Sequence, residues 1–239
     1  MIRFILLYAF MTLHTIIFCF WCVIIAVFDG SGRLVHFYGA VPWAKVILWV
    51  CGVKVDVGGR DYIDGRVPRI YMSNHQSYFD IFILLGHLPA NFKFILKEEL
   101  MKIPLLGFAM KRARYIAIDR GDPRKALKSM NEAARKIRNG ASVLIFPEGT
   151  RSEDGRLQPF KRGGFRLALK SGCEIVPVGI IKSRDIVPKG SLNIKKGRIG
   201  MNIGKPIPVK DYSKRETDQL ITHVREDMIR LMGSGDENA

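Results

Sequence analysis

Cysteine is scarce in this chain of 239 residues, and its four cysteines are too few and too scattered to staple a disulfide-rich fold. Cys19 and Cys22 lie in one apolar run, Cys51 lies in a second, and Cys173 lies far downstream. The Cys19-x-x-Cys22 spacing matches half of a zinc or redox site, but no second pair of Cys or His residues stands at metal-ligand spacing. We therefore interpret both cysteines as small apolar residues in hydrophobic packing.

Acidic residues are also in short supply, since 22 Asp and Glu face 38 Lys and Arg, which gives a net charge of +16 at pH 7. Such a charge favours partners that carry phosphate: nucleic acid, anionic lipid or phosphorylated metabolites. The chain lacks the interleaved aromatic and basic residues that stack nucleic-acid bases, so we expect no nucleic-acid partner. A hydrophobic content of 48% with only 11 prolines excludes a disordered or collagen-like chain.

Charged residues are missing from residues 4–28, a run that as a helix would extend about 37 Å and cross a bilayer. A cleavable signal peptide would have a shorter apolar core and a small-residue cleavage site, whereas Asp29 follows here. A second apolar stretch, residues 39–53, is short for a span; a re-entrant or interfacial helix is favoured, with a core helix as the alternative. We expect residues 1–55 to anchor the basic protein at the cytoplasmic face of the cell membrane.

The remainder of the chain alternates short strand-like runs with amphipathic helices, which predicts one α/β domain over residues 56–232. Its fold class is a mostly parallel sheet flanked by helices, followed by a flexible tail at residues 233–239. Asp122 before Pro123 opens one helix, and Ser213 with Glu216 forms a capping box for the last one. The predicted strands are residues 69–72, 92–96, 115–118, 143–146 and 174–181, of which the first reads as buried and the second as alternating.

Two details of the sheet are also predicted. Pro177 lies inside the fifth of these strands, which favours an edge position or a bulge because proline donates no backbone hydrogen bond. Residues 193–195 and 198–203 read as a hairpin around Lys196 and Gly197.

A polar segment follows the strand at residues 69–72, and the ends of parallel strands are where open α/β sheets bind ligands. Ser77 is a suitable N-cap, which places Asp80 in the first turn of a helix with its side chain pointing back toward the start. His75 then lies within reach of the Asp80 carboxylate, which would leave the other ring nitrogen as a general base. The alternative is that Ser77-x-x-Asp80 is only a capping box beside a surface histidine.

A second polar segment, Phe-Pro-Glu-Gly-Thr-Arg-Ser at residues 146–152, follows the strand at residues 143–146. Gly149 allows close backbone approach, and the guanidinium of Arg151 matches a phosphate group. The sequence contains neither a phosphate-binding P-loop nor the Gly-x-Ser-x-Gly elbow of many serine hydrolases. A histidine base without an activated side-chain nucleophile indicates that the substrate supplies the nucleophile, for which a hydroxyl is suitable.

Residues 74–80 (Asn-His-Gln-Ser-Tyr-Phe-Asp) and 146–152 resemble the first and third motifs of the glycerolipid acyltransferases, specifically the 1-acylglycerol-3-phosphate acyltransferases. The resemblance covers about residues 73–180. It implies that a fatty acyl group moves from a thioester of coenzyme A or acyl carrier protein to the sn-2 hydroxyl of lysophosphatidic acid, giving phosphatidic acid. Further segments that resemble this family are residues 97–100, 116–120 and 176–178.

The resemblance also implies roles for individual residues. His75 would take the hydroxyl proton, and Asp80 would orient the imidazole and stabilise its protonated form. Arg151, Lys97 and Arg120 would hold the phosphate of the acceptor. The other candidate substrate-binding residues are Asn74, Ser77, Glu148, Gly149 and Thr150.

No permanently bound cofactor and no metal are implied, and the expected partners are the bilayer, the lysolipid and the acyl donor. Two alternatives stay open. One is the same chemistry on glycerol-3-phosphate, another lysophospholipid or a lyso-amino-lipid. The other is a basic membrane-binding protein that keeps this fold without catalysis.

Overall fold

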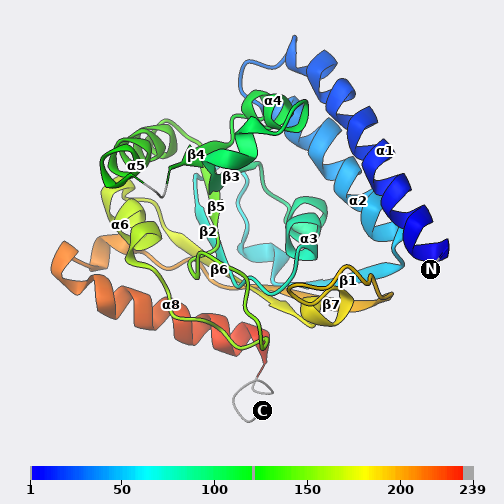
Figure 1. The fold of residues 1–239 in the computed structure, drawn as a ribbon. Helices are drawn as coiled ribbons and strands as arrows, with labels where there is room; N and C mark the ends of the chain where they lie inside the picture. Colours follow the sequence, from blue (N-terminus) through cyan, green and yellow to red (C-terminus); the bar gives the residue numbers. More distant parts are fainter. Residues whose placement is uncertain (1, 120–121, 234–239) are drawn as a thin grey trace.

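The computed structural model describes residues 2–119 and 122–233, which form a seven-stranded sheet in the order β1-β7-β6-β2-β5-β3-β4 (Figure 1). Neighbouring strands run parallel, except that β6 and β7 are antiparallel. The prediction of a mostly parallel sheet is therefore confirmed. The strands are β1 (Val53–Gly58), β2 (Ile70–Ser73), β3 (Phe92–Lys97), β4 (Ile116–Ile118), β5 (Ser142–Ile145), β6 (Ile175–Ile181) and β7 (Gly197–Ile203).

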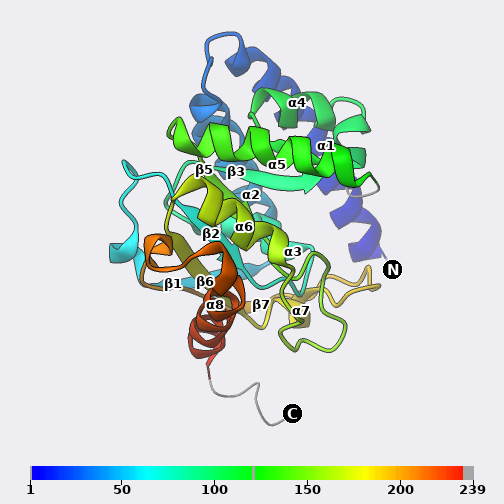
Figure 2. The ribbon, with the colours of Figure 1, turned by 90° about the vertical axis from the view of Figure 1, so that its left-hand side faces the viewer.

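Helices cover both faces of this sheet and make three layers (Figure 1). Helices α5, α6 and α8 pack on one face, which Figure 2 shows from the front, while α2 and α3 pack on the other, with α1 and α4 beyond them. The α-helices are α1 (Ile2–Ala26), α2 (Val41–Val50), α3 (Phe79–His87), α4 (Leu106–Arg112), α5 (Pro123–Arg138), α6 (Arg162–Ser171), α7 (Ser183–Ile186) and α8 (Thr217–Met232). A π-helical segment, η1 (Val35–Ala40), and short 3₁₀ turns η2 (Arg60–Tyr62), η3 (Glu98–Lys102), η4 (Val209–Asp211) and η5 (Lys214–Glu216) complete the elements.

The predicted helix starts are confirmed at α5 and α8. The Asp122 carboxylate accepts the backbone N–H groups of Arg124 and Lys125 at 2.8 and 3.2 Å, which satisfies donors that the first turn leaves unpaired. Ser213 and Glu216 form the capping box in the turn that leads into α8. Helix α8 buries Leu220, Val224 and Met228 at its contact with the sheet, as its apolar spacing predicts.

Of the two predicted details of the sheet, the first is confirmed as a bulge and the second, the hairpin, is wrong. β6 is an interior strand, so Pro177 is not at an edge, but the pairing with β7 shifts by one residue around it, from Val178 opposite Ile203 to Ile175 opposite Ile207. This shift is the bulge that a proline tolerates. The predicted hairpin does not form, because β7 pairs with the distant strands β1 and β6 instead of with the residues just before Gly197.

Helix α1 is the one helix in the described part of the chain that is long and apolar enough to cross a membrane. Only 22% of its most apolar 18-residue window is buried, and Ile17 and Ile24 are more than half exposed. The side of α1 that is covered includes Cys19 and Cys22, both free and buried against α4, so their interpretation as packed apolar residues is confirmed.

Helix α2, from the second apolar stretch, packs one face against α3. Ile47 and Leu48 are buried in the same core as the strands, whereas Trp49 is exposed. The buried face of α2 is what the alternative prediction, a core helix of the α/β domain, requires. The predicted boundary between residues 55 and 56 falls inside β1, and the predicted tail lies outside the described residues apart from Gly233.

Candidate active site

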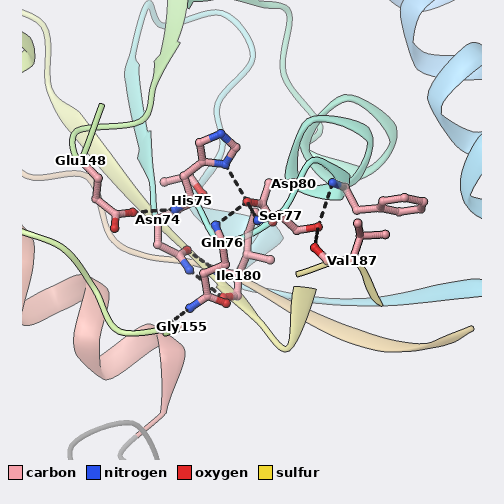
Figure 3. Close-up of polar contacts among 11 residues, drawn as sticks. Asn74, His75, Gln76, Ser77, Asp80, Glu148, Gly155, Ile180 and Val187 are labelled. Carbon is pink, nitrogen blue, oxygen red and sulfur yellow. Dashed lines mark hydrogen bonds and ion pairs between the residues drawn. The ribbon is translucent and has the colours of Figure 1, made fainter. Parts of the chain in front are cut away.

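His75 lies in the loop between β2 and α3, at the carboxyl edge of the sheet, and points toward Asp80 in the first turn of α3 (Figure 3). Its Nδ1 is 2.7 Å from Oδ2 of Asp80, and its ring stacks on Phe146 with 3.9 Å between ring centroids. Because a carboxylate accepts, Nδ1 carries the proton in this pair. Within the described residues Nε2 has no hydrogen-bond partner, which leaves it able to accept a proton.

The Asp80 carboxylate is fully buried and also organises the start of α3. Its Oδ2 accepts the backbone N–H groups of Gln76 and Ser77 at 2.7 and 2.8 Å, and the Ser77 hydroxyl accepts the N–H of Phe79 at 3.2 Å. Ser77 and Asp80 thus cap the start of α3, although the Ser77 hydroxyl accepts the N–H of Phe79 and not that of Asp80, as a full capping box would require. Oδ2 of Asp80 therefore has both of the roles considered from the sequence. It caps the start of α3, and it also forms the hydrogen bond with His75.

Glu148 supports His75 from the loop that follows β5. Its Oε1 accepts the backbone N–H of His75 at 2.6 Å (Figure 3), and its Oε2 accepts that of Gln158 at 2.8 Å. The side chain is 2% exposed. Burial raises the pKa of this carboxyl to about 7, against the lowering effect of its two backbone hydrogen bonds. Both oxygens are thus engaged with the protein, and they fix the backbone on which His75 stands.

This buried carboxyl predicts a pH-dependent stability. The pKa of Glu148 rises from its ordinary value of 4.5 to about 7 on folding, so its stabilising contribution is complete below pH 4.5 and is lost as pH rises through 7. The difference in unfolding free energy between the unaltered protein and a Glu148→Gln variant is expected to fall by up to about 3 kcal/mol over that interval. Denaturant unfolding at pH 4.5 and 8 measures it, with Glu132→Gln at an exposed position of α5 as control. A difference that stays constant with pH would contradict the prediction.

Three further side chains of this loop bond to neighbouring backbone. Asn74 pairs with both backbone groups of Ile180 in β6, its Nδ2 donating at 2.8 Å and its Oδ1 accepting at 2.7 Å, so the side chain extends the β2–β6 pairing by one step. Gln76 donates to the carbonyl of Gly155, at 2.6 Å. Ser77 donates to the carbonyl of Val187, at 2.8 Å. These bonds fix the loop on both sides of His75.

The residues predicted to bind the phosphate are Arg151, Lys97 and Arg120, and they differ in burial and in whether the structure describes them. The Arg151 guanidinium lies 3.5 Å from the ring centroid of Tyr78, and its buried Nη1 has no hydrogen-bond partner among the described residues. Lys97 is exposed at the carboxyl end of β3, and Thr150 is exposed next to Arg151. Arg120 lies outside the described residues.

Gly149 has a φ of 75°, a conformation that favours glycine. A Cβ at this position would stand about 3 Å from the side chain of Lys161, so the glycine also lets a lysine approach the loop. Lys161, which lies outside the second polar segment, thus places its side-chain amine beside Gly149.

Several contacts of the site were missed at the level of sequence. Phe146 supplies the surface on which His75 stacks, Gln158 shares the carboxylate of Glu148, and the Ser152 N–H donates to the His75 carbonyl at 2.8 Å. Phe146 and Ser152 belong to the second polar segment. The position of both polar segments after strands of one parallel sheet was therefore the signal that could have predicted these contacts. Within the described residues no group of His, Cys, Asp and Glu side chains could hold a metal ion.

Comparison with known proteins identifies the family. A family model described as Acyltransferase matches residues 54–181, which is more than half of the chain and includes both polar segments. The chain belongs to this acyltransferase family. Among solved structures, the chain is similar to the 1-acyl-sn-glycerophosphate (LPA) acyltransferase PlsC from Thermotoga maritima, with a TM-score of 0.83 and 25% identity, covering 99% of this chain and 97% of the other.

The chain is also similar to curated relatives that are named 1-acyl-sn-glycerol-3-phosphate acyltransferases. It is 38% identical over 185 residues to a chloroplastic 1-acyl-sn-glycerol-3-phosphate acyltransferase from Brassica napus, covering 77% of this chain and 53% of the relative. It is 35% identical over 199 residues to a 1-acyl-sn-glycerol-3-phosphate acyltransferase from Limnanthes douglasii, covering 83% and 70%. The chain spans about half the length of the first two curated relatives that it matches.

Proposed function

We propose that this acyltransferase moves a fatty acyl group from a thioester of coenzyme A or acyl carrier protein to the sn-2 hydroxyl of lysophosphatidic acid, giving phosphatidic acid. The names of the relatives support the acceptor. The observation that carries the proposal is the hydrogen bond between His75 Nδ1 and the buried Asp80, with Nε2 left to a substrate. The proposed reaction uses no resident cofactor.

In this reaction Nε2 of His75 accepts the proton of the sn-2 hydroxyl while the hydroxyl oxygen bonds to the thioester carbonyl carbon. Asp80 stabilises the imidazolium through the hydrogen on Nδ1. The tetrahedral intermediate collapses, the carbon–sulfur bond breaks, and the imidazolium returns its proton to the departing thiolate. The products are phosphatidic acid and a free thiol, and the base is regenerated.

Arg151 is the proposed ligand of the acceptor phosphate, with Lys97 and Arg120 as further cations. A buried guanidinium nitrogen without a partner among the described residues is costly unless a ligand pairs with it, and an anion is the natural ligand of arginine. Gly149 and Thr150 border this position. Asn74, Ser77 and Glu148 are proposed to act indirectly, by holding the backbone of His75.

Helix α1 is proposed to anchor the protein to the cytoplasmic face of the membrane, where a lysolipid would reach the site from the bilayer. Changing both Ile17 and Ile24 to Glu is expected to abolish membrane association, because a charge at the bilayer centre costs about 3 kcal/mol. Flotation with phosphatidylcholine–phosphatidylglycerol vesicles measures this. Leu127→Glu, at an exposed position of α5, is the control and should float. A double variant that still floats would contradict the anchor.

The proposed function is tested by assaying detergent-solubilised protein for thiol release and lipid product. Thiol release from acyl-CoA or acyl carrier protein should require lysophosphatidic acid and yield phosphatidic acid. Faster release with glycerol-3-phosphate or another lysophospholipid would overturn the choice of acceptor. Release without acceptor would indicate a thioesterase, and no release with either donor would favour a non-catalytic membrane-binding protein.

A further inference from the structure

A cavity of about 410 Å³ opens beside the end of β6, and nothing in the proposed reaction so far uses it. Its walls come from α7, the segment that follows α7 and the start of β7. This volume is within the range of small-molecule sites, about 300–1,000 Å³. The charged residues of its lining are Lys182, Arg184, Lys195, Lys196, Arg198 and a single acid, Asp185.

The positive charge of this cavity is only partly balanced by the protein. Arg198 pairs with Asp56 at 2.5 Å, and Nε of Arg184 donates to the carbonyl of Glu153 at 3.1 Å. Within the described residues Lys182, Lys195 and Lys196 form no ion pair. Three unpaired ammonium groups around one cavity favour a ligand that carries several negative charges.

The cavity lies at the same edge of the sheet as His75. β6 runs parallel to β2, so Lys182 just after β6 and His75 just after β2 follow neighbouring strand ends. One loop joins the two places: Glu153 contacts Arg184, and the preceding Ser152 donates to the His75 carbonyl at 2.8 Å. Arg151, the proposed acceptor ligand, does not line the cavity. The cavity is therefore a basic surface separate from Arg151, at the same edge of the sheet as His75.

We propose that this cavity binds the phosphate groups at the nucleotide end of the acyl-CoA donor. The inference rests on the proposed acyl transfer, whose two substrates are both anionic. Coenzyme A carries three phosphate groups at one end and its thiol at the other, so phosphates in the cavity let the pantetheine arm follow residues 152–155 toward His75. The donor and the acceptor thus use separate cations, the lysines of the cavity and Arg151.

A lipid headgroup is the other source of phosphate near this cavity. The Tyr8 hydroxyl of α1 donates to the carbonyl of Leu192 at 2.8 Å, so the segment that follows α7 touches the proposed membrane helix. The position of the cavity beside the ends of β2 and β6 favours the donor. The experiment therefore compares coenzyme A with anionic lipid directly.

The test uses the full chain with Lys195→Gln and Lys196→Gln combined, and a matched double variant, Lys205→Gln with Lys210→Gln, at exposed positions outside the cavity. The cavity variant is expected to raise the KM for acyl-CoA about tenfold, with kcat and the KM for lysophosphatidic acid unchanged. With an acyl thioester of N-acetylcysteamine, which lacks the nucleotide, both variants should equal the unaltered protein. Calorimetry should show about tenfold weaker binding of free coenzyme A to the cavity variant alone.

An unchanged KM for acyl-CoA would overturn the proposal, and so would an equal loss with the short thioester. A defect that appears only when phosphatidylglycerol is present would assign the cavity to a lipid headgroup instead. Absence of turnover by the unaltered protein with both acyl-CoA and acyl carrier protein thioesters would refute the acyl transfer itself. Calorimetry with coenzyme A would still decide the cavity in that case, because it needs no reaction.

Discussion

Replacing His75 with Ala is expected to lower kcat for acyl transfer by about 10²–10⁴, the usual contribution of a positioned general base. The His75 imidazole can accept the hydroxyl proton through Nε2, a nitrogen without a partner in the described chain. Without it, an uncharged hydroxyl must attack the thioester directly. Thiol release from acyl-CoA in the presence of lysophosphatidic acid measures the loss, and the KM for either substrate should change little.

The control for this variant is His223→Ala. His223 lies on α8, where Nδ1 contacts the hydroxyl of Tyr212 at 2.6 Å, so it tests the loss of a hydrogen-bonded histidine outside the site. Its kcat should stay within about twofold of the unaltered protein, since an isolated surface change has little effect. Because His75 also stacks on Phe146, thermal unfolding of both variants shows whether the fold persists. A His75→Ala variant that is folded and fully active would exclude this histidine as the base.

The architecture could be predicted because local patterns carry it. Short β-branched runs separated by amphipathic helices indicated a parallel sheet, and Asp122 and Ser213 marked helix starts by their capping chemistry. The position of Pro177 shows what such patterns leave open, here the choice between an edge position and a bulge. Its effect on β6 depends on which strands lie on either side, and β7 joins from a distant part of the chain.

In the candidate site, too, short-range contacts could be predicted from the sequence and long-range contacts could not. His75 and Asp80 are five residues apart, so the cap at Ser77 was enough to bring them together. Glu148 is 73 residues from His75, and Asn74 is 106 residues from Ile180. In the sequence, each is a polar residue at the end of a strand and suggests a substrate contact. Only the order of strands in the sheet shows that the partner of each is backbone.

Replacing Asp80 with Asn is expected to separate the two roles of this carboxylate, which are to cap the start of α3 and to place a negative charge beside His75. The amide oxygen can take the place of Oδ2 and keep the bonds to His75, Gln76 and Ser77, while the amide nitrogen replaces Oδ1, a buried atom without a partner in the described chain. The fold should therefore survive at a cost of about 1–3 kcal/mol. The negative charge that stabilises the imidazolium is lost, so kcat should fall by about 10²–10⁴.

The matched control is Asp122→Asn, which neutralises the carboxylate that caps α5 away from the reacting groups. It should cost less than about 1 kcal/mol of stability, because Asn caps a helix about as well as Asp and only the charge at the helix start is lost, and it should leave kcat unchanged. Asp80→Ala should lose more stability than Asp80→Asn, because it also removes the acceptor of two backbone N–H groups. If Asp80→Asn keeps full kcat, Asp80 serves α3 alone and the capping alternative is correct. A large loss of kcat in a stable Asp80→Asn variant shows instead that the charge beside His75 acts in the reaction.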